Sequence, residues 1–70
     1  MTGWKGGIIM SNLSSKEVTA LEEQLSAERV LVAKYRGMAS QVSDAVIKNK
    51  LETIASRHQA HFDRIMSFLN

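Results

Sequence analysis

Two stretches of this chain place apolar side chains at alternating spacings of three and four residues, and this repeat constrains the fold most. It predicts two α-helices that each bury one face. The inward-facing positions of the first stretch are Val18, Leu21, Leu25, Glu28, Val32, Tyr35, Ala39 and Val42. Those of the second stretch are Ile47, Leu51, Ile54, His58, His61, Ile65 and Phe68. With 70 residues and no proline, the chain is expected to form one small all-α domain.

The start of the first helix has a recognisable capping sequence. Ser14 and Glu17 have the spacing of a capping box, in which each side chain bonds to the backbone N–H of the other residue. The first helix is therefore expected to run from Ser15 to about Gln41.

The connection between the two helices is short. The repeat breaks at residues 42–44, and Ser43 or Asp44 is expected to cap the second helix. A connection of a few residues predicts an antiparallel hairpin. Glu28 precedes Ser43 by 15 residues and His58 follows it by 15, so the two side chains are expected to share one layer of the hairpin.

The chain is expected to divide into an N-terminal arm and a helical part. Residues 1–12 hold three of the four glycines and show no sustained repeat, which predicts a flexible arm, and residues 13–70 form the hairpin. A single layer of two helices cannot cover its own apolar faces, and the absence of cysteine excludes disulfides. We therefore expect a homodimer, in which two hairpins form a four-helix bundle.

Three polar residues occupy inward-facing positions: Glu28, His58 and His61. A charged carboxylate is costly to bury unless it is paired or bound to a cation. His58 and His61 are three residues apart, so they share one face of their helix. Two histidines and one carboxylate with open positions are a ligand set of zinc and non-haem iron sites. The pattern predicts a transition-metal site.

An alternative needs no metal. Glu28 would then pair with a protonated histidine, with Arg57 or with Arg64, and the polar layer would only fix the register of the helices. The chain would be a purely structural or protein-interaction module. Trp4, in the arm, could then serve as a docking handle.

Charge and hydropathy indicate which partners to expect. The formal net charge is +2, and the nine basic residues are interspersed with seven acidic ones, so no nucleic-acid partner is expected. The apolar run Ile8–Met10 is far shorter than a signal peptide or a membrane span requires. We expect a soluble protein without a membrane partner, cytoplasmic by default.

The order of Glu28, Tyr35 and His61 resembles the first two helices of rubrerythrin-type proteins, which belong to the ferritin-like superfamily. Their pattern is a glutamate, a tyrosine seven residues later, and Glu-x-x-His in the next helix. The opening Leu-Ser-Ser-Lys-Glu at residues 13–17 is similar to that of short spore coat proteins of the coat F type, found in endospore-forming bacteria. The resemblance implies a ferritin-like bundle and a spore coat location or partner.

The resemblance also implies roles for individual residues. Glu28 matches the metal ligand of the first helix, Tyr35 a residue that hydrogen-bonds a ligand, and His61 the histidine of Glu-x-x-His. His58 departs from the pattern, because it stands where the family has a carboxylate that bridges two metal ions. Two divalent ions in the dimer would keep uncompensated positive charge, which disfavours a di-iron centre and metal-dependent redox catalysis. The ions expected are zinc, iron, nickel, copper or manganese, and no catalytic residue is assigned.

Overall fold

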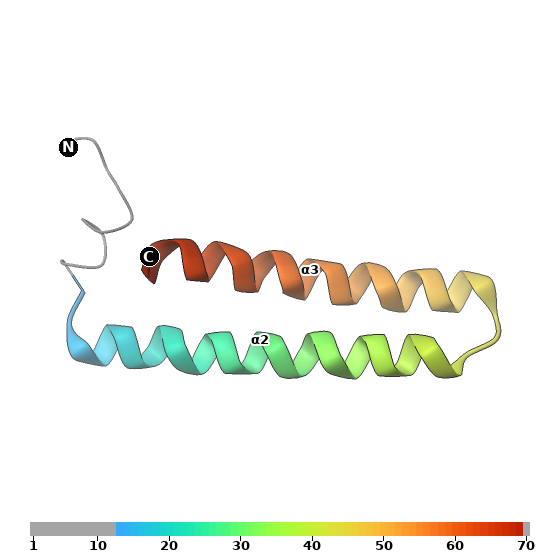
Figure 1. The fold of residues 1–70 in the computed structure, drawn as a ribbon, viewed down its shortest axis with the longest axis horizontal. Helices are drawn as coiled ribbons and strands as arrows, with labels where there is room; N and C mark the ends of the chain where they lie inside the picture. Colours follow the sequence, from blue (N-terminus) through green and yellow to red (C-terminus); the bar gives the residue numbers. More distant parts are fainter. Residues whose placement is uncertain (1–12, 70) are drawn as a thin grey trace.

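The computed structural model describes residues 13–69, which form a hairpin of two long antiparallel helices (Figure 1). Helix α2 spans Ser15–Gln41 and helix α3 spans Ala45–Leu69. All regular structure in residues 13–69 is helical, which confirms the predicted all-α fold. The expected arm at residues 1–12 lies outside the described residues. Neither described helix is long and apolar enough to cross a membrane.

The start of α2 is fixed by the predicted capping box. The Ser14 hydroxyl accepts a hydrogen bond from the Glu17 backbone N–H at 3.1 Å, and the Glu17 carboxylate accepts one from the Ser14 N–H at 2.9 Å. These bonds satisfy backbone donors that the helix itself leaves unpaired. They also hold the pKa of Glu17 below its ordinary value, since they stabilise the charged form.

The connection between the helices is fixed by side chains from α3 and from the residue before it. Asp44 Oδ1 accepts hydrogen bonds from the backbone N–H groups of Val46 and Ile47 at 2.9 and 3.0 Å, so Asp44 caps α3. Lys48 Nζ donates to the carbonyl oxygen of Ala39 at 3.1 Å, in the last turn of α2. A cation at this position also complements the negative end of the helix dipole. The turn is therefore anchored to both helices, and this anchoring sets their register.

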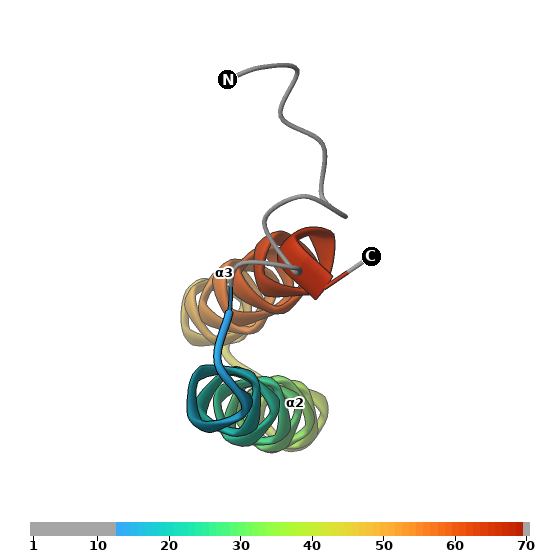
Figure 2. The same ribbon diagram turned by 90° about the vertical axis from the view of Figure 1, so that its left-hand side faces the viewer.

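The core of the hairpin is small. The two helices lie side by side in both views (Figures 1 and 2). The buried hydrophobic residues of the described part are Val32, Ala39 and Ala55, exposed by 8%, 2% and 1%. No side chain there is both large and fully buried. The two alanines allow a close approach of the backbones, but the hairpin encloses little apolar volume.

The contact face of α3 differs from the strict repeat expected from the sequence. Ile47 and Phe68 are 49% and 38% exposed, and the His61 side chain is 57% exposed, so a single hairpin does not bury these expected inward-facing residues. Phe62 and Leu69 are half-buried instead. A straight helix has 3.6 residues per turn, so a seven-residue column drifts by about 20° per repeat. Toward the end of α3, His61 and Phe68 therefore point away from α2, and the next residue of each, Phe62 and Leu69, points toward it.

Candidate metal centre

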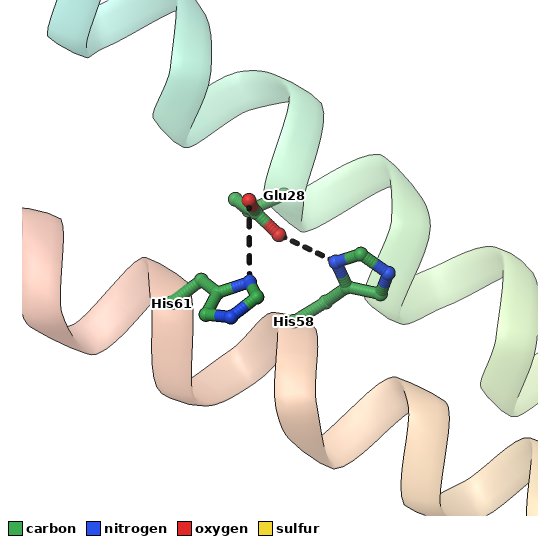
Figure 3. A group of neighbouring side chains, drawn as sticks. All are labelled: Glu28, His58 and His61. Atoms are coloured by element: carbon green, nitrogen blue, oxygen red, sulfur yellow. Dashed lines mark hydrogen bonds and ion pairs between the residues drawn. The ribbon is translucent and has the colours of Figure 1, made fainter.

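Glu28, His58 and His61 come together near the middle of the hairpin (Figure 3). Glu28 projects from α2, and the two histidines project from neighbouring turns of α3. His58 Nδ1 lies 2.7 Å from Glu28 Oε1, and His61 Nδ1 lies 3.6 Å from Glu28 Oε2. The layer predicted from the equal distances to the turn is therefore present, and it contains all three candidate ligands.

The three side chains differ in their access to solvent. Glu28 is 6% exposed, whereas the side chains of His58 and His61 are 23% and 57% exposed. The carboxylate thus forms the inner end of the cluster, and the cluster opens to solvent on the side of His61.

A fourth residue, Gln24, contacts the cluster and was missed in the sequence. Its Nε2 donates a hydrogen bond of 3.0 Å to Glu28 Oε2, the same oxygen that faces His61. Gln24 lies one turn before Glu28 on α2, a spacing at which helix side chains are neighbours. The four-residue spacing could have predicted this contact. Gln24 was not considered because it does not belong to the inward-facing repeat.

Hydrogen bonding keeps Glu28 ionised. The bond from His58 is the main cause that lowers the pKa of Glu28 below its ordinary value of 4.5. Burial acts in the opposite direction, and the bond from Gln24 and the nearby histidines lower the pKa further. Within residues 13–69, no buried side-chain nitrogen or oxygen lacks a hydrogen-bond partner. The carboxylate is therefore fully accommodated as an anion.

This lowered pKa predicts how stability depends on pH. Because the folded-state pKa of Glu28 lies below the unfolded one, its stabilising contribution is present above about pH 4.5 and is lost as the pH falls through the folded-state value. The Glu28→Gln variant has no carboxylate to protonate, so its unfolding midpoint should fall less steeply as the pH drops below about 4.5. Thermal unfolding followed by circular dichroism at several pH values measures both slopes. Equal slopes would contradict the assignment.

Tyr35 contacts the cluster through its ring. The rings of Tyr35 and His58 are stacked, with centroids 6.0 Å apart and planes inclined by 10°. His58 and His61 meet edge to face, with centroids 5.7 Å apart. Tyr35 was expected to hydrogen-bond a metal ligand. The contact found is stacking, which limits the orientations open to the His58 ring.

The ligand atoms are close to the spacing that one metal ion requires. One atom from each of Glu28, His58 and His61 lies within 4.8 Å of the others. Around a tetrahedral zinc ion with bonds of about 2.0–2.1 Å, ligand atoms are about 3.4 Å apart. A cation here would keep open positions toward solvent.

A proton competes with an ion at this cluster. A carboxylate only accepts hydrogen bonds, so His58 Nδ1 is the donor in its 2.7 Å contact with Glu28. An imidazole nitrogen must lose its proton before it ligates a metal through that atom. The structure thus pairs Glu28 with a histidine, and the same residues also form the candidate ligand set.

Comparisons with known proteins found no family model, no curated protein and no solved structure that matches this chain. The resemblance to rubrerythrin-type and coat F-type proteins therefore stays a prediction.

Proposed function

We propose that this chain binds one transition-metal ion per copy through Glu28, His58 and His61, within a ferritin-like four-helix bundle formed by two copies. The observation that carries the proposal is the convergence of three ligand side chains from two helices around a buried carboxylate. All three residues stand where the repeat of the sequence calls for apolar side chains. Glu28 occupies the buried position at which a charge is most costly.

The donor set indicates the class of ion. Two imidazole nitrogens and one carboxylate oxygen favour zinc, iron, nickel or copper, whereas magnesium and calcium prefer oxygen ligands. Because the ligands come from both helices, a bound ion would join α2 to α3 and stabilise the folded hairpin by an amount that grows with the logarithm of its affinity. The proposed role is ion binding, with water or another small ligand in the remaining positions.

A second candidate is a structural or protein-interaction module without a metal. It is favoured by one observation, that Glu28 is already hydrogen-bonded by His58 and Gln24. In this alternative the polar layer fixes the register and the number of helices that pair.

Titration of the ion-free full chain with Zn²⁺, followed by calorimetry, tests the proposed function. The unaltered chain should bind about one ion per copy, and Glu28→Ala and His61→Ala should each weaken binding by at least about 100-fold, since a direct ligand matters more than the groups that support it. Glu22→Ala removes an exposed carboxylate of the same helix and should change nothing. Full binding by both ligand variants would refute the assignment.

A further inference from the structure

One side of the hairpin carries exposed apolar side chains around the opening of the cluster. Gln24 of α2 and His61 of α3 both approach Glu28 Oε2, so both border this side. Residues seven positions apart on a helix lie in nearly the same direction. Two columns of residues spaced in this way run along this side. The α2 column is Gln24, Leu31 and Met38, and the α3 column is Ile47, Ile54, His61 and Phe68. We call these seven residues the His61 face.

The His61 face contains large apolar side chains that the hairpin leaves uncovered. Met38, Ile47 and Phe68 are 43%, 49% and 38% exposed, and Leu31 and Ile54 are half-buried. The buried core described above, in contrast, holds two alanines and one valine. The hairpin thus leaves large apolar side chains exposed on this face, as expected where a further layer packs.

The dimensions of the His61 face suit a second copy. The distance from Ile47 to Phe68 along α3 is about 32 Å at 1.5 Å per residue, and two helices side by side are about 20 Å wide. The α2 column, from Gln24 to Met38, is about 21 Å long, so with about 10 Å of width per helix the face covers about 530 Å² per copy, and two copies would bury about 1,060 Å² in total. Stable interfaces exceed about 1,000 Å².

Charges beside the face determine how two copies can be oriented. Lys50, Arg57 and Arg64 each follow a residue of the α3 column by three positions, so they form a basic edge along α3. On α2 the corresponding positions are Ala27, Lys34 and Gln41, with a single charge. Packing α3 against α3 would bring two basic edges together. Packing α3 of each copy against α2 of the other separates them.

We propose that a second copy of this chain docks on the His61 face, with α3 of each copy against α2 of the other. Two-fold symmetry then covers the exposed His61 side chain of both copies and closes the open side of both clusters. This docking surface extends the proposed function. Only the closing of the ion site depends on that function; the docking itself does not. Lys34 of one copy still faces the basic edge of the other, so salt should strengthen the pairing.

Sedimentation equilibrium of the ion-free full chain tests the docking surface. The unaltered chain should dimerise, more tightly at about 0.5 M than at about 0.05 M salt. Ile47→Lys and Met38→Lys should raise the dissociation constant of the dimer at least about tenfold, since each buries a charge in the interface. Val30→Lys, at a 64% exposed position on the outer side of α2, should leave the constant unchanged. Circular dichroism of each variant checks that the helices persist.

A monomeric unaltered chain, or equal dimerisation of all three lysine variants, would overturn the inference. A second measurement separates this outcome from failure of the proposed function. Release of Zn²⁺ to a chelator should be at least about tenfold faster from Ile47→Lys than from the dimer, because the closed side is then open. A dimer that binds no Zn²⁺ would refute the proposed ion binding alone. A monomer that binds Zn²⁺ would refute the docking of a second copy, and with it the proposed bundle, but would leave the ion binding of the single hairpin intact.

Discussion

Replacement of Glu28, His58 and His61 together by leucine is expected to raise the unfolding midpoint of the ion-free chain by about 5 °C or more. Ionised and hydrogen-bonded groups lose hydration when they are buried, and apolar side chains of similar volume avoid this loss. Leucine at positions 28 and 58 would also continue the apolar repeat on the contact faces of both helices. Glu28, His58 and His61 would then make the ion-free chain less stable than leucine does, as expected of residues retained for function.

Thermal unfolding of both chains by circular dichroism, at equal concentration and with a chelator present, measures this difference. Glu28→Leu alone is the control, and it should be less stable than the triple variant because His58 loses its carboxylate partner. The number of copies per particle separates the two candidate functions. A metal site predicts an unchanged dimer in the triple variant, whereas a register device predicts a changed number. A triple variant that unfolds at a lower temperature would contradict the expectation.

The substitution Ala55→Leu is expected to lower the free energy of unfolding by about 1–3 kcal/mol. Ala55 is 1% exposed and lies on α3 one turn before His58. The larger side chain has no space between the helices, so it must push α3 away from α2. The same displacement would lengthen the 2.7 Å contact between His58 and Glu28, and it should weaken ion binding as well.

Urea unfolding followed by circular dichroism measures the effect of Ala55→Leu. Ala60→Leu is a matched control, because residue 60 is exposed on the same helix and the added side chain meets solvent. This control should change the free energy of unfolding by no more than about 0.5 kcal/mol. Equal free energies of unfolding for the two variants would contradict a close contact between the helices at Ala55.

The helices and their register could be predicted because short-range rules determine them. Ser14 and Glu17 specify the first turn of α2 through two hydrogen bonds, and Asp44 specifies the first turn of α3. Given a short turn, equal distances along the two helices place Glu28 opposite His58, and the structure has them 2.7 Å apart. No knowledge of the rest of the molecule was needed for these predictions.

The contact face of α3 and the surroundings of the cluster could not be predicted in the same way. Whether a helix follows a strict seven-residue repeat or drifts from it depends on supercoiling, which the pattern of Ile47, His61 and Phe68 does not specify. Stacking of Tyr35 on His58 depends on side-chain rotamers chosen after the helices pack.

The metal content of the purified protein tests whether the chain binds a transition-metal ion. The full chain should be prepared without a histidine tag, beside the variant that carries both His58→Ala and His61→Ala, and both should be examined by elemental mass spectrometry. We expect about one transition-metal ion per copy in the unaltered chain and none in the variant. Equal metal content in the two proteins, or no metal in either after incubation with zinc, iron and manganese, would contradict this expectation.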